Sequence, residues 1–291
     1  MSIPTQLSQT VRSTMPQSPM ISFHDGNQIP QLGYGVWQVE NEVTQDVVGQ
    51  ALAAGYRHID TAHIYGNESD VGAALRASGL DRDEVFITSK LWNDDHGYDT
   101  TLKAFNATMD NLGLDVLDLF LIHFPVPSKT LRVQTWKAFI ELHKQGRIRS
   151  IGVSNFRIED LEELEAETGV IPVINQIELH PYFVQQQLRD YHASKGIVTE
   201  SWSPLGQGGG ELTDPVIADI ANAHGATPAQ VIIAWHLALG LVVIPKSETP
   251  ERIVANFESL ELQLNDAEVD AISALNKGEQ GRQGVNPNTP S

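Results

Sequence analysis

The feature of this sequence that most constrains its fold is a regular alternation of two kinds of segment. Short apolar runs with the composition of β-strands alternate with amphipathic stretches of helix length, which is typical of a parallel sheet covered by helices. The expected strands span residues 32–36, 58–60, 86–90, 117–123, 148–154, 174–179, 198–201 and 242–245. The expected helices span residues 43–54, 68–77, 98–112, 131–145, 158–168, 186–195, 228–239 and 251–260.

The composition of a single strand indicates how the sheet is covered. Residues 119–122 read Leu-Phe-Leu-Ile, continuously apolar rather than alternating, which indicates a parallel strand buried on both faces. About eight βα units are the number that closes a barrel. The alternative is an open doubly wound sheet, which favours a G-x-G-x-x-G sequence after its first strand, and residues 33–38 lack the last glycine. We therefore predict an α/β fold of the (β/α)8 TIM barrel type.

Several segments lie outside this repeat. Asp25 and Gly26 form a turn dipeptide between two short β runs, so we expect an N-terminal β-hairpin that plugs the barrel floor. Residues 215–224 and 266–275 are predicted as two extra helices, and a short tail follows. Residues 1–20 are polar and lack the apolar core of a signal peptide, so we expect a disordered leader before a single domain over 21–291.

The charge balance limits the possible partners. The 291 residues include 19 Lys and Arg against 37 Asp and Glu, which is a net charge of −18 at pH 7. A chain this acidic repels nucleic acid and anionic membrane surfaces, and no apolar run is long enough to span a bilayer. The chain contains no cysteine, which excludes disulfides, thiolate metal sites and Cys nucleophiles and fits a reducing compartment. We expect a cytoplasmic protein without nucleic-acid, membrane or metal partners.

Polar and ionisable residues are concentrated where the expected strands end. In a barrel of this kind the chemistry gathers at those ends, in the loops that lead from strand to helix. The residues at these positions are Asp60, Lys90, His123, Ser154, Asn155, Gln176, Trp202, Lys246 and Ser247. Polar residues that merely face solvent are not concentrated at strand ends, so we interpret these positions as the rim of an active site.

Four of the side chains near these ends can form a proton donor. Tyr65 follows Asp60 after five residues, and a free phenol has a pKa of about 10, which makes it a reluctant acid near neutrality. The ammonium of Lys90 can lower that pKa, and Asp60 can be the counter-ion that a buried lysine needs. His123 can hydrogen-bond and orient a substrate oxygen. This is general-acid catalysis on a carbonyl, whose carbon must receive a hydride from a nicotinamide.

Each of these residues also has a simpler interpretation. Asp60 and Lys90 can form a structural ion pair at a strand end. Tyr65 can be a loop anchor, and His123 and Trp202 can be core residues. The catalytic interpretation is favoured by the combination, because four such groups at the ends of three successive strands are hard to obtain by chance.

The chain contains seven motifs in a characteristic order: GYRHIDTAHIYGNE, FITSKLW, DLFLIHFP, IRSIGVSNF, NQIELHPY, ESWSPLGQG and VIPKSETPERIVANF. With these motifs the sequence resembles the aldo-keto reductases over about residues 20–285. WSPLGQG and the short tail after Leu275 are similar to the bacterial branch that includes the 2,5-diketo-D-gluconate reductases. This resemblance implies an NADPH-dependent reductase of aldehydes and ketones on a (β/α)8 barrel.

The resemblance also implies roles for particular residues. Tyr65 matches the general acid of the family, Lys90 and Asp60 match the residues that tune it, and His123 matches the residue that orients the carbonyl. NADPH or NADP+ is the implied cofactor, with NADH disfavoured. The implied cofactor contacts are Gly35, Val36, Trp37, Asp60, Ser154, Asn155, Gln176, Trp202, Ser203, Leu205, Gly206, Lys246, Ser247, Arg252 and Asn256.

Within this set, the nicotinamide end and the loop beside the pyrophosphate are assigned by the resemblance alone. Ser154, Asn155 and Gln176 match the positions that hydrogen-bond the carboxamide. Trp202 matches the aromatic residue on which the nicotinamide ring stacks, and Ser203, Leu205 and Gly206 match the loop beside the pyrophosphate.

The site for the 2′-phosphate of NADPH also has support from charge. Lys246 and Arg252 are cationic in a strongly acidic chain, and Arg252 lies at the start of an expected helix, which favours an anion. The alternative is that the two cations pair with Glu248 or Glu251. Ala255 stands where many relatives have a Glu near the adenine, so we expect the adenine end of the cofactor to be held less tightly.

The substrate pocket is expected to be aromatic and open. Its implied lining residues are Trp37, Tyr65, Trp92, His123 and Phe124. Aromatic walls suit small aldehydes and flat carbonyls, with keto-sugars and α-dicarbonyls as possible substrates. Only a few residues separate Pro125 from the next helix, which indicates a permissive site. The resemblance suggests a monomer or a weak homodimer.

Two other functions are considered. Some relatives of the family bind cofactor with little turnover and serve regulatory or structural roles. A barrel glycosidase would need paired carboxylates near strand ends, for which Glu178 and Glu200 are the candidates, without further support.

Overall fold

The barrel sheet follows the chain from its first strand to its last. The computed structural model describes residues 16–126 and 130–287. Eight parallel strands form one sheet, in which each strand pairs with the next along the chain. Their bounds are β3 (Tyr34–Gly35), β4 (His58–Asp60), β5 (Phe86–Leu91), β6 (Leu117–Ile122), β7 (Ile148–Ser154), β8 (Ile174–Glu178), β9 (Val198–Trp202) and β10 (Val242–Val243).

The sheet closes on itself between its two edges. Leu32 forms a parallel bridge with Val243, and the backbone N–H of Gly33 donates to the Val243 oxygen at 2.9 Å. The N–H of Val243 in turn donates to the Gln31 oxygen at 2.9 Å. The predicted (β/α)8 barrel is therefore confirmed.

The two strands at this seam are shorter than expected. The prediction covered residues 32–36 and 242–245, whereas β3 and β10 have two residues each. At the seam the edges are joined by a single bridge and a few separate hydrogen bonds, so a continuous ladder does not form. Pro245 also lacks the N–H that a longer β10 would need.

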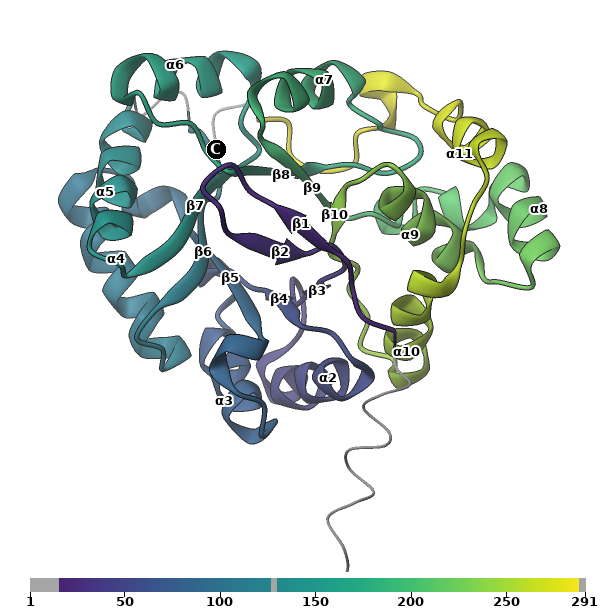
Figure 1. Cartoon of the computed structure of the whole chain (residues 1–291), viewed down its shortest axis with the longest axis horizontal. Helices are drawn as coiled ribbons and strands as arrows, with labels where there is room; N and C mark the ends of the chain where they lie inside the picture. The colour runs from purple at the N-terminus through teal and green to yellow at the C-terminus, as the bar shows by residue number, and fades with distance from the viewer. Residues whose placement is uncertain (1–15, 127–129, 288–291) are drawn as a thin grey trace, which may run out of the picture.

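A ring of helices surrounds the strands, as Figure 1 shows in a view along the barrel. The helices of the repeat are α2 (Asn41–Ala54), α3 (Glu68–Ala77), α4 (Tyr98–Leu112), α5 (Arg132–Lys144), α6 (Ile158–Thr168), α7 (Gln186–Lys195), α9 (Pro228–Ala238) and α10 (Pro250–Glu258). The two extra helices are also confirmed, as α8 (Pro215–His224) and α11 (Asp266–Ser273). Helix ends depart from the expected ones by at most two residues, which is the usual uncertainty of such boundaries.

The strand β6 shows why the barrel strands are continuously apolar. Leu119 and Leu121 are buried in a cluster with residues of the N-terminal hairpin, on the inner side of the barrel. Phe120, between them, packs against the helices instead, with ring centroids 5.2 Å from Phe105 and 4.8 Å from Phe139. Each face of the strand is therefore covered, and burial of such side chains is worth about 1.5–3 kcal/mol each.

The N-terminal hairpin closes one end of the barrel. Its strands β1 (Met20–Ser22) and β2 (Gln28–Pro30) pair antiparallel and cross the barrel end in Figure 1. In the turn, Asn27 Nδ2 donates to Ser150 Oγ at 3.1 Å, and Ser150 Oγ donates to Asp25 Oδ2 at 2.8 Å. Ser150 lies near the start of β7, so the hairpin covers the amino ends of the strands and leaves the carboxyl ends to the site.

Three expectations fall partly outside the described residues. Residues 1–15 of the expected leader are outside them, and Met20 is the first residue of β1. Residues 127–129 of the loop after Pro125 and residues 288–291 of the tail are outside them as well. The single domain over 21–291 stays a prediction. In the part of the chain that the structure describes, no helix is long and apolar enough to cross a membrane.

Candidate active site

A buried ion pair lies where β4 and β5 end. Lys90 Nζ donates to Asp60 Oδ1 at 2.5 Å and to the backbone oxygen of Thr61 at 2.9 Å. Both charged side chains are almost completely buried. Burial by itself would lower the pKa of Lys90, but the Asp60 carboxylate outweighs this and raises that pKa, so the ammonium keeps its charge.

Tyr65 stands directly above this pair. It ends a short 3-10 helix, His63–Tyr65, that begins three residues after β4, and Lys90 Nζ lies 5.2 Å from the centre of its ring. Burial raises the pKa of the Tyr65 hydroxyl above its ordinary value, and the charge of Lys90 opposes this only in part. Lys90 thus lowers the pKa as expected from the sequence, but burial has the larger effect.

Asn67 holds the Tyr65 loop in place, and the sequence reading did not identify it. Thr61 Oγ1 donates to Asn67 Oδ1 at 2.8 Å, and Asn67 Nδ2 donates to the Val36 oxygen at 3.0 Å. The side chain is fully buried and joins the segments that directly follow β3 and β4. A buried asparagine just before a helix is hard to recognise from sequence, because asparagine at that position is usually an exposed cap.

His123 faces Tyr65 from the end of β6. Its ring centroid lies 5.8 Å from that of Tyr65 and 5.2 Å from that of Trp92, both edge to face. Burial and the nearby charge of Lys90 place the pKa of His123 well below its usual value, so the imidazole is neutral at pH 7. Its Nδ1 is buried and has no hydrogen-bond partner among the described residues. A neutral imidazole at this position can hydrogen-bond a carbonyl oxygen and so orient it.

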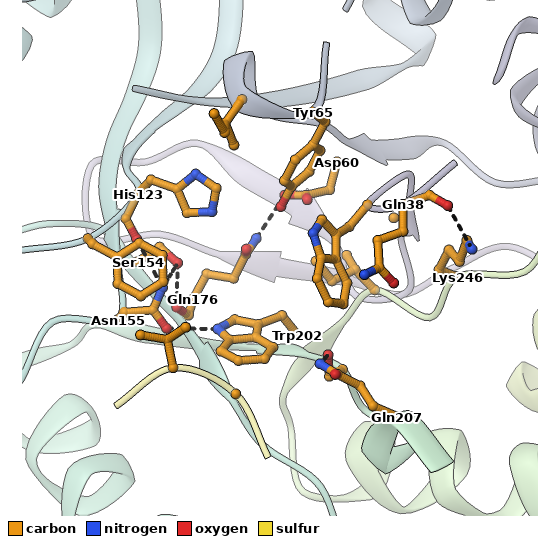
Figure 2. A pocket seen from close by; sticks show the side chains of 18 of the residues that line it. Gln38, Asp60, Tyr65, His123, Ser154, Asn155, Gln176, Trp202, Gln207 and Lys246 are labelled. Carbon is orange, nitrogen blue, oxygen red and sulfur yellow. Dashed lines mark hydrogen bonds between the residues drawn. The ribbon is translucent and has the colours of Figure 1, made fainter. Parts of the chain in front are cut away.

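Gln176 and Asn155 lie next to these groups, as Figure 2 shows. Gln176 Nε2 donates to Asp60 Oδ2 at 2.8 Å and to Glu200 Oε2 at 2.9 Å, which leaves its Oε1 to accept from a ligand. Asn155 has both ends of its amide engaged, because Nδ2 donates to the His123 oxygen and Oδ1 accepts from Trp202 Nε1, each at 2.9 Å. Its φ of 63° is left-handed, a conformation that asparagine tolerates.

Glu200 is the second buried acid below the site. It is completely buried, and burial followed by the charge of Asp60 raises its pKa to about 8. His58, Asp60 and Glu200 offer ligand atoms within 4.8 Å of one another. Lys90 already supplies a positive charge beside Asp60, and Glu200 is protonated at neutral pH. His58, Asp60 and Glu200 are therefore better explained as a buried cluster in which Glu200 carries a proton than as a metal site. Neither Glu200 nor Glu178 lines the cavity described below, which argues against the glycosidase alternative.

A cavity of about 620 Å³ opens above these residues. Most of the predicted site residues line it, namely Gly35, Trp37, Asp60, Tyr65, Trp92, His123, Phe124, Ser154, Asn155, Gln176, Trp202, Ser203 and Lys246. The predicted residues that do not line it are Val36, Lys90, Leu205, Gly206, Ser247, Arg252 and Asn256. The lining residues that the sequence reading missed are Gln38, Ile64, Pro204, Gln207, Ile244, Gln283, Gly284 and Val285.

Of the residues expected at the 2′-phosphate, Lys246 lines the cavity, whereas Ser247 and Arg252 do not. Lys246 Nζ lies 2.6 Å from Glu248 Oε1 and donates to the Gln38 oxygen at 3.2 Å, so for Lys246 the alternative pairing with Glu248 is the one observed. Arg252 is exposed in the first turn of α10. Ser247 is buried, and its Oγ accepts the backbone N–H of Thr249 at 3.1 Å. Arg252 therefore lies in the first turn of α10, and Lys246 lies four residues before that helix begins.

Comparisons with known proteins agree with this geometry. The model of the aldo/keto reductase family matches residues 31–277. The chain belongs to the aldo/keto reductase family. An aldo-keto reductase of Mycolicibacterium smegmatis is 55% identical over 272 residues, which are 94% of this chain and 98% of the relative. Methylglyoxal reductase DkgA of Escherichia coli K12 is 50% identical over 267 residues, which are 91% of this chain and 96% of the relative.

Solved structures of other aldo-keto reductases have the same fold. Apo Gox0644 has a TM-score of 0.91 and 48% identity, with 95% of this chain and 100% of that chain covered. A Gox0644 mutant in complex with NADPH gives the same values. The aldo/keto reductase from Brucella melitensis has a TM-score of 0.86 and 54% identity, with 89% and 100% covered. The resemblance seen in the sequence, including its bacterial branch, is confirmed.

Proposed function

We propose that this aldo-keto reductase reduces aldehydes and ketones to alcohols with NADPH. One observation carries the proposal. Tyr65, Asp60 and the neutral ring of His123 line one cavity together with Lys246, and Lys90 supports them through its bond to Asp60. Few other reactions need a phenol backed by an ammonium beside an uncharged imidazole.

The residues present suit a nicotinamide cofactor. The amide of Gln176 is fixed by Asp60 and Glu200 so that its oxygen remains as an acceptor for a carboxamide N–H. The indole of Trp202, held by Asn155, offers a flat apolar face beside it. Lys246 and Arg252 at the start of α10 suit a phosphate. When bound, the cofactor supplies the hydride that a carbonyl carbon must receive.

The protein's own groups handle the proton. Burial keeps the proton on the Tyr65 hydroxyl at neutral pH, so the donor is in the acid form that the reaction needs. As that proton passes to the carbonyl oxygen, the ammonium of Lys90 stabilises the phenolate left behind. Asp60 keeps Lys90 charged, and the neutral His123 orients the oxygen. Tyr65 is therefore the general acid, and the other three prepare it and its substrate.

The decisive variant is Tyr65→Phe, which removes only the hydroxyl. We expect kcat to fall by about 100-fold or more, since a general acid contributes roughly 10²–10⁴. NADPH binding, measured by fluorescence titration, should stay close to that of the unmodified protein. Tyr98→Phe, an exposed tyrosine on α4, is the matched control and should keep its activity. Full activity in Tyr65→Phe would refute the mechanism.

The proposed substrates are small aldehydes and α-dicarbonyls. The outer cavity is walled by Trp37, Trp92 and Phe124, with Phe124 stacked on His123 at 5.3 Å. Relatives at about half identity are named methylglyoxal reductases, which fits small dicarbonyls. A panel of aldehydes, α-diketones and keto-sugars, followed by NADPH absorbance, tests this class. Tight NADPH binding without turnover on the whole panel would favour the alternative of a cofactor-binding protein with a regulatory or structural role.

A cytoplasmic location and a monomeric or weakly dimeric state belong to the same proposal. The absence of cysteine fits a reducing compartment, where NADPH is also the abundant form of the cofactor. Size-exclusion chromatography with light scattering measures the oligomeric state, and cell fractionation measures the location.

A further inference from the structure

A second buried ionisable group lies beside the active site and has no part in the proton transfer. Glu178 ends β8, His180 follows two residues later, and Glu211 begins the 3-10 helix Glu211–Thr213. His180 Nε2 lies 3.0 Å from Glu178 Oε1, and its Nδ1 lies 2.8 Å from Glu211 Oε1. All three side chains are completely buried. Two acids and a histidine are costly to bury, so the arrangement needs a reason.

Glu178 holds the C-terminal segment of the chain. Its Oε1 accepts the backbone N–H of Gln283 at 2.7 Å, and its Oε2 accepts that of Gly284 at 2.9 Å. Both oxygens of the carboxylate are thus used on neighbouring amides, and hydrogen bonds to a charged acceptor are about twice as strong as neutral ones. Gln283, Gly284 and Val285 all line the active-site cavity.

The same segment is pressed against Trp202. A Cβ placed on Gly284 would lie 2.2 Å from Trp202 Cη2 and 2.9 Å from Glu178 Oε2, so only glycine fits between the two. The opposite edge of the indole is held by the hydrogen bond from its Nε1 to Asn155. The position of Trp202 therefore depends on Asn155 at one edge and on Gly284 at the other.

Glu211 contacts both the C-terminal segment and the loop that contains Gly206. A Cβ on Gly206 would lie 2.2 Å from the carboxyl carbon of Glu211, so the loop packs directly on that acid. Gln283 Nε2 also donates to Glu211 Oε1, at 3.4 Å. Glu211 is thus a buried contact common to two segments that are far apart in the sequence, the C-terminal segment and the turn Gly206–Gly208.

The pKa shifts of Glu178 and His180 agree with the contacts between the two side chains. Burial would raise the pKa of Glu178, but the hydrogen bonds from His180, Gln283 and Gly284 outweigh it and lower that pKa. Burial would likewise lower the pKa of His180, but its contacts with Glu178 and Glu211 raise it above its usual value. Glu178 is therefore ionised at neutral pH, as an acceptor of two amides should be.

We propose that Glu178, held by His180 and Glu211, is a positioning residue that seats residues 283–285 against Trp202. In this way it sets one wall of the carbonyl pocket and steadies the face on which the nicotinamide would stack. The kinetic part of this inference rests on the proposed reductase function, whereas the seating of the segment does not.

The test compares Glu178→Gln with a matched control, Glu279→Gln. Glutamine keeps the shape but leaves one of the two backbone amides without an acceptor. Glu279 lies on the same C-terminal segment, is exposed, and forms an ion pair with Arg282. Hydrogen exchange of peptides covering residues 282–285 is measured without substrate. We expect exchange at least tenfold faster in Glu178→Gln and unchanged in Glu279→Gln; equal exchange in the two variants would overturn the proposal.

Kinetics provide a second measurement on the same variants. A displaced wall weakens carbonyl binding, so KM for the carbonyl should rise by about tenfold in Glu178→Gln while kcat changes less. A loss confined to kcat would contradict a positioning role. If the unmodified protein reduces no carbonyl, the reductase function fails, and the exchange result still decides the seating of the segment.

A variant on the other partner keeps the test valid if Glu178→Gln does not fold. Gly284→Ala forces the segment away from Trp202 and from Glu178 Oε2 while leaving all three buried ionisable residues in the sequence. It should raise KM and accelerate exchange in the same way, and Glu178→Gln added to it should have little further effect. Additive effects of the two substitutions would show that they act separately and would refute the proposal.

Discussion

At the scale of single residues, Asp60 and Lys90 combine a structural role with the chemical one that we propose. Each is buried at the end of its strand, and Lys90 donates directly to the Asp60 carboxylate. Both could be predicted from the sequence, because each ends an apolar strand. Asn67 could not, and Glu200 could be assigned only as a weak glycosidase candidate, since their importance depends on partners that no local pattern reveals.

We expect Asp60→Asn to be strongly destabilising. The substitution removes the carboxylate to which the buried ammonium of Lys90 donates, and breaking a buried ion pair in this way costs about 3–5 kcal/mol. Urea denaturation of the purified protein measures the loss. Adding Lys90→Met removes the uncompensated charge, so the double variant should recover part of the stability. A double variant that loses the sum of the two single effects would contradict this account.

At the scale of elements, the strand and helix pattern could be predicted almost completely. The alternation of apolar runs and amphipathic stretches is local, and the ends of α2 to α11 fall within two residues of their expected positions. The exceptions are β3 and β10, whose shortening follows from the geometry of barrel closure. Closure joins the two ends of the repeat, which a local pattern does not describe.

The start of α10 should decide between NADPH and NADH. Arg252 lies in its first turn, where a charge-assisted hydrogen bond to a phosphate is worth about 1.5–3 kcal/mol. We expect Arg252→Ala to weaken NADPH binding about tenfold or more and to leave NADH binding unchanged. Fluorescence titration with both cofactors measures this. Lys103→Ala, an exposed cation on α4, is the control, and equal losses for the two cofactors would exclude a role at the 2′-phosphate.

At the scale of the whole molecule, buried titratable groups limit stability at both ends of the pH range. Burial lowers the pKa of His192 and of His236 to about 4, so the stability that comes from keeping them neutral is lost as the pH falls through that value. Burial raises the pKa of Glu200 to about 8, so its contribution is complete below about pH 4.5 and is lost as the pH rises through 8.

Glu200→Gln should therefore flatten the alkaline side of this profile. Glutamine resembles the protonated acid, which the folded protein prefers. The free energy of unfolding of the unmodified protein should fall relative to that of the variant by about 1 kcal/mol per pH unit between about pH 5 and 8. Thermal or urea unfolding across that range measures it. Glu167→Gln on the exposed face of α6 is the control and should show a parallel profile.

The sequence by itself determined the repeat, the barrel and the residues at the carboxyl ends of the strands. Parallel strands deliver those ends to one rim, so position within each local segment was enough to bring Asp60, Lys90, His123 and Gln176 together. Only the tertiary structure decided what lies around them. The contact of Glu178 with Gln283 and Gly284 joins segments more than a hundred residues apart. Such contacts arise from packing in three dimensions and leave no periodicity in the chain.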